Sequence, residues 1–529
     1  MSTKEIGVQK NAPLKQFYDL DTINTVKVDF KNGNGCYGRK NIVINCSVEE
    51  FYANPVKVIK DNLANILSAH RQNCEEMDYL NNYIKGKQDI LNKTRANSDT
   101  VINNKHVSNL AWEFVNFKKG YYVGKPLKYV DLNTEENSQM KYFNRYLRNQ
   151  NKSSKDLIKY ENMLITGIAY TMTIPKKVAY DNEYESPFTY TILNNNDVCV
   201  VKSNDISRTK LFSMCFSRMK DATGGSDYYI YTIYYGNNVL ELEYKSGDLN
   251  LIKKAVMPIS DCITEYQLNE QRMGVFEPVL IALNSINKIN SDQLDQFEEN
   301  INSYLTFENV DVASIIENID EFRRKRILVV NTNNVETPAK IGSVNVQVEQ
   351  NPINEKLREL KQETYDIIAV PMPTSSTGQG VSGEAQVYGG GWENAQTIAH
   401  VDTLYTMQYE SEDLYKFIEI CKNGVDSKVS NLVPSDIEIK YTINKSNNMM
   451  VKSQSLKYFL DGGFTREQAL TFCEITDDPQ NEGKIADKNY ENQIRTEMEL
   501  ELEKKKKEKE LNNQQQEVQN PTNNFDKNE

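Results

Sequence analysis

The sequence predicts an α+β protein, and three observations support this class. Two long helical patterns, at residues 275–305 and 384–421, carry apolar residues at three- and four-residue spacing. Ahead of the second pattern, residues 369–383 are rich in proline, glycine and hydroxyl residues and fit neither a helix nor a regular strand. Residues 188–257 hold short β-branched and aromatic runs between turn residues, which predicts an antiparallel sheet. Long helices beside a polar loop suit a mechanical part better than a substrate pocket.

Composition and charge limit the possible function classes. The chain has 529 residues, 39% hydrophobic and 26% charged, which predicts a globular body of two to four domains. No apolar run approaches the roughly 20 residues of a membrane span, and the N-terminus lacks an apolar signal region. We therefore expect a cytoplasmic protein without a membrane partner. The net charge of −12 disfavours tight, sequence-independent DNA binding, but it suits a surface that DNA slides past.

Residues that could carry catalysis or bind a metal form no recognisable pattern. The eight cysteines contain no CxxC pair and the three histidines are far apart, so we expect neither a metal site nor a disulfide framework. Two GxGxxG patterns do not predict a dinucleotide site: the one at 33–38 follows a strand-like run but opens no helix, and the one at 378–383 precedes a helix but follows prolines rather than a buried strand. We therefore expect no cofactor. Phosphate-binding, metalloprotease and serine-hydrolase motifs are also missing. We predict no catalytic residues, and read His400 as a packing or surface residue.

The first part of the chain predicts an arm followed by helices. Residues 1–54 are polar and predict an extended arm with little core of its own, although residues 26–30, Val-Lys-Val-Asp-Phe, are β-like. Pro55 begins a helical pattern with regular apolar spacing. A further helix is predicted at 74–91, interrupted by Gly86.

Helices and strands then alternate up to the predicted sheet. A helix is predicted at 107–117, because cations in its last turn and Gly120 just beyond form a common helix ending. Helices at 140–150 and 155–167 follow, and then a strand at 168–174. The expected strands of the sheet are 188–193, 198–201, 211–216, 228–235 and 239–244.

The long helix at 275–305 carries a single apolar stripe. As a straight helix its residues would span about 46 Å. Two interpretations remain open, because such a stripe either faces the core of its own chain or packs between subunits. The stripe consists of Val279, Leu283, Ile286, Leu294, Phe297, Ile301 and Leu305.

A small module follows this helix, and a second helix returns from it. Residues 306–352 combine a helical piece with two β-like runs, and a helix is predicted at 353–368. The module contains a basic cluster, which is either a solvated helix end or a surface that docks a partner or faces DNA. The cluster consists of Arg323, Arg324, Lys325 and Arg326.

The last part of the chain predicts a strand, two short helices and a tail. The strand is expected at 437–441 and the helices at 453–460 and 465–472. From residue 491 the sequence is strongly charged, with too few apolar residues to pack, which predicts a solvated helix that frays into disorder.

Four stretches, in this order, resemble segments of the SPP1-type portal proteins of tailed bacteriophages. The resemblance covers roughly residues 55–490. Each stretch alone is a weak signal, and their order and spacing carry the likeness. The stretches are Phe114-Val-Asn-Phe-Lys-Lys-Gly-Tyr-Tyr-Val-Gly-Lys-Pro126, Leu164-Ile-Thr-Gly-Ile-Ala-Tyr170, residues 276–305 with Asn290-Ser-Asp-Gln-Leu294, and Val381-Ser-Gly-Glu-Ala385 ahead of the second long helix.

The resemblance implies a portal fold. This fold has long stem and tunnel helices, an antiparallel β-rich wing, a small α/β clip and a helical crown. The implied regions are the arm 1–54, the wing 55–275, the stem helix 276–305, the clip 306–352, the second stem helix 353–368, the tunnel loop 369–382, the long helix after the loop 383–422, the crown 423–490 and the charged tail 491–529.

The resemblance also implies a function. Such proteins form a ring of roughly twelve copies at one capsid vertex, through which DNA is packaged and ejected. Their partners are terminase, head-completion or adaptor proteins, and the major capsid and scaffolding proteins. The protein would reside in the virion, and in the host cytoplasm during assembly. Arg323 to Arg326 would dock partners.

The implied tunnel loop would face the DNA. Its hydroxyl, amide and glycine residues carry no charge and can make short-lived phosphate contacts without holding DNA tightly. These residues are Thr374, Ser375, Ser376, Thr377, Gly378, Gln379 and Gly380. Two alternatives stay open: a cytoplasmic enzyme with an unrecognised active site, and a helical scaffold or adaptor protein without a DNA channel.

Overall fold

The structure, a computed structural model, divides the chain into two compact units, residues 1–444 and 445–529. Both contain helices, and unit 1 also contains four sheets, so the predicted mixture of helix and sheet is confirmed. The described residues are 38–94, 102–132, 138–176, 185–220, 228–301, 304–309, 340–344, 350–372, 391–423, 428–443, 449–473, 475–476 and 479–518.

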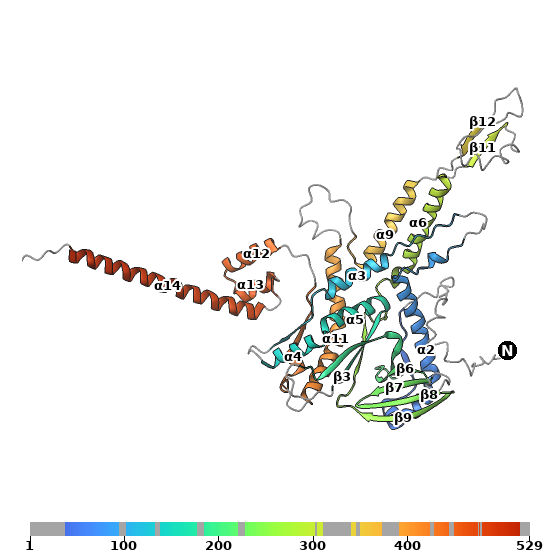
Figure 1. Cartoon of the computed structure of the whole chain (residues 1–529), viewed down its shortest axis with the longest axis horizontal. Coiled ribbons are helices and arrows are strands. Elements are labelled where there is room, and N and C mark those ends of the chain that lie inside the picture. Colours follow the sequence, from blue (N-terminus) through green and yellow to red (C-terminus); the bar gives the residue numbers. More distant parts are fainter. Residues whose placement is uncertain are drawn as a thin grey trace, which may run out of the picture. The chain divides into compact units, whose positions relative to one another are not determined.

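The largest sheet of unit 1 has six strands in the order β1-β5-β6-β7-β8-β9 (Figure 1). Neighbouring strands are antiparallel except for β1, which pairs in parallel with β5. Alternate residues of β7 are buried in an apolar core, and the residues between them are partly exposed. The strands are β1 (Ile42–Ile44), β5 (Val198–Ser203), β6 (Lys210–Met219), β7 (Tyr228–Tyr235), β8 (Asn238–Lys245) and β9 (Asp248–Val256).

Helices α1 (Val48–Ala53) and α2 (Pro55–Ile84) contribute to the core of this sheet. Ser47 caps α1 by accepting a hydrogen bond from the Glu50 backbone N–H. Phe51 stacks on Phe212 of β6, with ring centroids 4.9 Å apart. The described part of the expected arm, residues 38–54, is therefore built into a core and differs from the arm that we expected.

A second sheet has three strands in the order β10-β3-β4, all antiparallel. Helix α11 (Trp392–Lys422) contacts all three strands, α4 packs on the same core as α11, and α5 contacts β3 and β4. The bounds are β10 (Ile263–Gln267), β3 (Ile168–Pro175), β4 (Phe188–Leu193), α4 (Ser138–Asn149), α5 (Lys152–Thr166) and the short turn η5 (Asn195–Asp197).

Two helix predictions near the N-terminus were wrong. The two helices expected from Pro55 onward are one continuous helix, α2, because Gly86 (φ +87°) lies just beyond its end and not inside a second helix; a short turn, η4 (Asp89–Asn92), follows. Helix α3 (Leu110–Val123) runs through Gly120, where we expected an end. The buried residues that follow Gly120 outweigh the helix cost of one glycine.

The two helices of the implied stem flank a small sheet in the chain. A 3-10 turn, η6 (Glu277–Val279), leads into α6 (Leu280–Ile301). Figure 1 shows α6 and α9 (Gln350–Ile368) side by side, with the antiparallel pair β11 (Tyr304–Glu308) and β12 (Lys340–Val344) beyond them. The predicted helices at 275–305 and 353–368 are thus confirmed, with shifted ends.

The C-terminal part of the chain is divided between the units. The turn η7 (Pro434–Asp436) precedes β13 (Ile437–Lys440), which pairs with β2 (Lys128–Asp131) inside unit 1. The unit boundary after residue 444 therefore differs from the implied crown boundary at 423. Unit 2 contains α12 (Met449–Asp461), α13 (Arg466–Cys473) and the long α14 (Pro479–Val518), and Phe459, Phe464 and Phe472 pack together.

Candidate functional site: the loop base, the α11 cluster and the stem joint

The residues that we predicted as functional lie outside the described part of the chain. The basic cluster falls between β11 and β12 in the sequence, and the loop falls between α9 and α11. Those residues are Arg323, Arg324, Lys325, Arg326, Thr374, Ser375, Ser376, Thr377, Gly378, Gln379 and Gly380. The structure does describe the residues that flank each of these segments.

The described residues on either side of the segment 373–390 lie next to each other. A Cβ atom placed on Gly391 would be 3.8 Å from the Cα of Pro371. Ala369 and Gly391 both have positive φ, +55° and +88°, so the chain turns sharply on leaving α9 and on entering α11. The described residues that flank the segment therefore lie at one place in unit 1.

Both ends of this segment are anchored in the same apolar core. Tyr365 and Val370 are buried there, and Tyr365 meets the Phe114 ring edge-on at 5.0 Å. On the other side, the Trp392 ring lies 5.7 Å from Phe117 and 6.2 Å from Tyr121. Aromatic packing of this kind fixes the loop base to α3.

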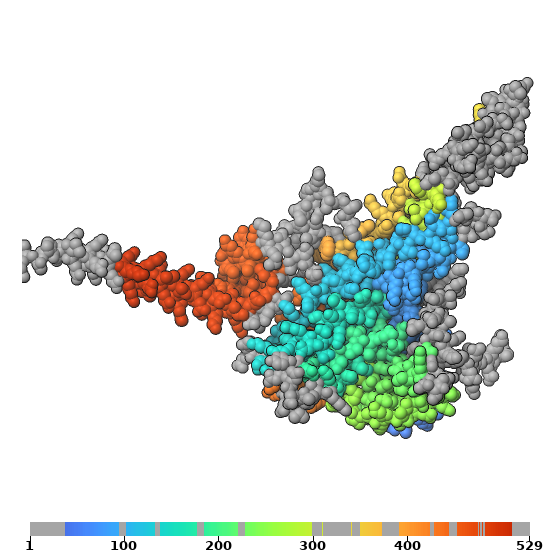
Figure 2. All heavy atoms as spheres, viewed as in Figure 1, coloured from blue at the N-terminus to red at the C-terminus, as the bar shows by residue number. Residues whose placement is uncertain are grey.

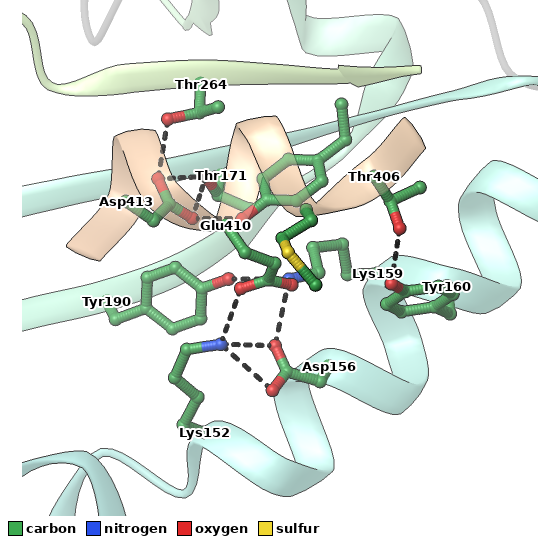
Figure 3. Close-up of polar contacts among 12 residues, drawn as sticks. Lys152, Asp156, Lys159, Tyr160, Thr171, Tyr190, Thr264, Thr406, Glu410 and Asp413 are labelled. Carbon is green, nitrogen blue, oxygen red and sulfur yellow. Dashed lines mark hydrogen bonds and ion pairs between the residues drawn. The ribbon is translucent and has the colours of Figure 1, made fainter. Parts of the chain in front are cut away.

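Helix α11, which carries the loop's C-terminal end, is fixed by a buried charged cluster (Figure 3). Lys152 of α5 donates to Asp156 at 2.8 Å and to Glu410 of α11 at 3.1 Å. Lys159 donates to Asp156 at 3.0 Å and is also bonded to Glu410. All four side chains are 5% exposed or less. We call these four residues the α11 cluster.

The α11 cluster is electrically balanced. Burial alone would raise the pKa of Glu410, but the ammonium groups of Lys152 and Lys159 together lower it. Burial opposes the charge of Lys152, yet the carboxylates of Asp156 and Glu410 hold its pKa well above the usual range. Two cations thus face two anions, all with partners, so the cluster is suited to fixing two helices together rather than to moving protons.

A second group of polar contacts joins α11 to the three-stranded sheet. Asp413 accepts hydrogen bonds from Thr171 of β3 at 3.0 Å, and from Thr264 and Tyr266 of β10 at 2.5 and 2.7 Å. One turn further on, Lys416 donates to the Thr264 hydroxyl at 2.6 Å. These bonds hold the helix to both neighbouring strands.

The first half of α11 is fixed to α3 and α5. Tyr122 of α3 donates to Asp402 at 2.6 Å, and Lys118 lies 3.8 Å from the same carboxylate. The Tyr160 hydroxyl lies 2.9 Å from that of Thr406. Polar contacts therefore run along α11 from near the loop to the sheet, while His400 is exposed, as one of our two interpretations expected.

The apolar stripe of α6 divides into two halves. Val279, Leu283 and Ile286 are buried in the core of unit 1. Further along, the Leu294 and Phe297 side chains are 44% and 65% exposed within the single chain. The first half is thus core-facing, and the second half is open for packing between subunits.

The opposite, polar side of α6 is contacted by residues 93–94 and 102–108. Buried Asp295 bonds to Lys93 at 2.8 Å and accepts from the Asn104 backbone N–H at 2.6 Å. Asn287 accepts from the Ser108 backbone N–H at 2.8 Å. These contacts stiffen the stem beyond the point where the apolar core ends.

The start of the stem is a tightly packed joint. A Cβ on Gly274 would be 2.2 Å from the Ile165 carbonyl oxygen, and one on Gly167 (φ +81°) would be 2.1 Å from that of Arg272. Only glycine allows backbones to approach so closely. Next to them, buried Glu277 accepts from the Gly38 and Gly274 N–H groups at 3.0 and 3.1 Å.

A single guanidinium lies between two carboxyl groups at this joint. Arg39 lies 2.9 Å from Glu277 and 3.2 Å from Glu76 of α2. Burial raises the pKa of Glu277 to about 7, against the opposing effect of Arg39 and the two N–H groups. As the pH falls through about 7, the Glu277 carboxyl of the folded protein therefore binds a proton.

Stability should consequently fall as pH rises through this range. The unfolded pKa is 4.5, so the folded state binds the extra proton between about pH 4.5 and 7, and deprotonation there costs on the order of 3 kcal/mol. Glu277→Gln should remove this part of the pH dependence. Denaturant unfolding of the unchanged protein and of Glu277→Gln, each at pH 5 and at pH 7.5, measures how the free energy of unfolding changes with pH. The same change with pH in both proteins would contradict the assignment.

Within the described ranges, no group of three or more His, Cys, Asp or Glu side chains is arranged to hold a metal ion. Among the helices that the structure describes, none combines the length and the apolar character needed to cross a membrane. The described cysteines are free thiols.

Comparison with known proteins identifies the class. The family model described as "Phage portal protein, SPP1 Gp6-like" matches residues 63–515. Together with the mixed helical and sheet fold, this match defines a phage-like portal vertex protein. More specifically, the chain belongs to the SPP1 Gp6-like family of phage portal proteins, which is structural rather than enzymatic. The resemblance found in the sequence is thereby confirmed.

Other comparisons add similarity only. No curated protein matches the chain. A chain in the solved structure titled "Virion of native gene transfer agent (GTA) particle" is 10% identical, with a TM-score of 0.38, over 69% of this chain and 89% of that one. A chain in "Neck of empty GTA particle computed with C6 symmetry" is 11% identical, with a TM-score of 0.39 and the same coverage. The family assignment rests on the family match.

Proposed function

We propose that the chain assembles with itself into a ring of roughly twelve copies at one capsid vertex and forms the conduit for DNA packaging and ejection. The observation that carries this proposal is the loop base. Pro371 and Gly391, which flank the segment 373–390, lie next to each other. Gly391 leads into α11, which buried charged residues hold against α5. A firmly held base suits a loop that projects into a channel and meets moving DNA.

The other parts of the portal plan are part of this proposal. Helices α6 and α9 form the stem, the sheets and helices of residues 55–275 form the wing, and residues 306–352 form the clip. Arg323 to Arg326 of the clip contact terminase and later the head-completion proteins. Unit 2 contributes to the crown, beside the packaged DNA. ATP hydrolysis belongs to the terminase, because this chain has no phosphate-binding loop motif.

Electron microscopy of the purified full chain tests the proposal. We expect rings with a central hole about as wide as a DNA duplex. Compact monomers under all conditions would contradict it and would favour a scaffold, adaptor or enzyme instead.

Removing residues 374–380 should impair DNA packaging and leave the rings intact. The segment has little apolar surface to bury, so folding should not depend on it. A packaging assay, with ring formation followed by electron microscopy, measures both effects. A length-matched control replaces Thr374, Ser375, Ser376 and Thr377 with alanine, and separates the role of the hydroxyls from that of loop length. Loss of folding in the deletion would refute the loop assignment.

A further inference from the structure

The strand β9 is an open edge of the six-stranded sheet. It has nine residues and pairs with β8 on one side, and no other described strand lies on its outer side. Figures 1 and 2 show this end of the sheet at the surface of unit 1. An unpaired edge presents a row of backbone N–H and C=O groups that can pair with another strand.

The side chains of β9 are unusually apolar for an exposed edge. Leu251, Ile252 and Val256 are 48%, 53% and 74% exposed. A bulge shifts the pairing with β8 at Glu241 and Leu242 and sets Ile252 outside the regular register. A strand added to this edge would cover apolar surface as well as complete the backbone hydrogen bonds.

The outer edge of the three-stranded sheet, by contrast, is covered by side chains. At the outer strand β4, the Tyr190 backbone N–H donates to Gln150 at 3.1 Å, and the Tyr190 carbonyl accepts from Lys155 at 2.5 Å. Side chains thus occupy that edge. Among the described residues, none makes such a contact to the outer side of β9, which indicates an edge left available for a partner.

The charges on β8 and β9 specify the kind of strand that fits. Lys253 pairs with Glu241 of β8 at 3.1 Å across the solvent side of the sheet. Opposite charges on neighbouring strands are favourable, so an added strand should carry an acidic residue beside Lys253. It should also carry apolar residues at alternate positions, to cover the edge.

The chain itself contains a segment with this pattern that is not already part of a described sheet. In residues 26–30, Val26, Val28 and Phe30 alternate with Lys27 and Asp29, so one face of such a strand is apolar and the other charged. We propose that this segment of a neighbouring copy pairs with β9 and extends the sheet between subunits. The proposal rests on the ring assembly proposed above.

The connection to β1 favours a neighbouring copy over the same chain. Phe30 is eight residues before Gly38, a reach of at most about 29 Å. Gly38 leads into β1, at the opposite edge of the sheet. Crossing five strand spacings to the same chain's β9 already needs about 24 Å in a straight line, without going around the sheet. The edge of an adjacent subunit has to lie within the same reach of Gly38, but pairing with it needs no path around the chain's own sheet.

Photo-crosslinking of full-length rings tests the proposal. Ile252 is replaced with p-benzoylphenylalanine in rings assembled from isotope-labelled and unlabelled chains, and the crosslinked peptides are identified by mass spectrometry. We expect crosslinks to residues 26–30, including pairs that join a labelled to an unlabelled chain. The same photoreactive residue at Ile206, which is fully exposed away from this edge, is the matched control and should not give them.

A second variant keeps the outcome clear. Val28→Asp with Phe30→Asp should abolish the crosslink while electron microscopy still shows rings. Rings whose crosslinks join only one chain to itself, or reach other segments or another protein, overturn this inference and leave the proposed function standing. Failure to form any ring overturns the proposed function and this inference with it.

Discussion

Replacing Glu410 with glutamine is expected to lower the free energy of unfolding by about 3–5 kcal/mol, the usual cost of breaking a buried ion pair from one side. The substitution leaves Lys152 and Lys159 buried, with Asp156 as their only remaining carboxylate. Two ammonium groups then share one anion in a site from which water is excluded. Denaturant unfolding of the purified variant measures the loss.

The matched control for this prediction is Glu393→Gln, at an exposed position in the first turn of the same helix. It removes the same charge without burying a cation, so it should cost well under 1 kcal/mol. Combining Glu410→Gln with Lys159→Gln should recover part of the loss, because the double variant also removes the unpaired ammonium. Equal losses in Glu410→Gln and the control would mean that the α11 cluster does not stabilise the fold.

The same contact has a consequence for the loop. Because α11 carries the C-terminal end of the segment 373–390 and Glu410 fixes the helix to α5, weakening the cluster should reduce the rigidity of the loop base. Buried ionic groups often define one arrangement rather than adding stability. If the segment faces moving DNA, as we propose, one fixed arrangement of its base is the more useful property.

The helices were predictable from the sequence because their apolar spacing reports directly on burial. The stripe of α6 and the pattern from Pro55 both placed helices correctly. Errors arose where tertiary packing outweighs a local signal, as at Gly120, which lies inside α3 because Tyr121, Tyr122 and Val123 are buried together.

The strands β9 and β10 were not predicted individually. Most residues of β9 are exposed, and Lys253 and Lys254 interrupt the alternation of apolar and polar residues that marks a half-buried strand. β10 contains Glu265, which is buried against Arg272. In both cases the strand is defined by its pairing partner and not by its own composition.

The α11 cluster could not be predicted either. Lys152, Asp156 and Lys159 have the spacing of an ordinary solvated helix face, and Glu410 is 251 residues from Lys159. Nothing local distinguishes such residues from surface charges. The only hint is that acidic residues recur on α11 at Asp402, Glu410 and Asp413, on a helix with few other signals.

Placing a charge on the exposed half of the α6 stripe should prevent ring assembly while leaving the monomer folded. Phe297 and Leu294 are 65% and 44% exposed in the single chain, so Phe297→Asp or Leu294→Asp removes little intrachain packing. Between subunits, the same carboxylate would lie unpaired in an apolar contact, where burying it is very costly. In a closed ring every interface repeats the penalty.

Size-exclusion chromatography with light scattering, followed by electron microscopy, measures this effect, and thermal unfolding of the monomer checks the fold. The control is Ile206→Asp, which introduces the same charge at a fully exposed apolar residue between β5 and β6. We expect monomers or small oligomers from the stem variants and rings from the control. Rings formed by the Phe297→Asp or Leu294→Asp variant would show that this half of α6 faces solvent in the assembly. The contacts between subunits would then have to involve α9 or the proposed wing.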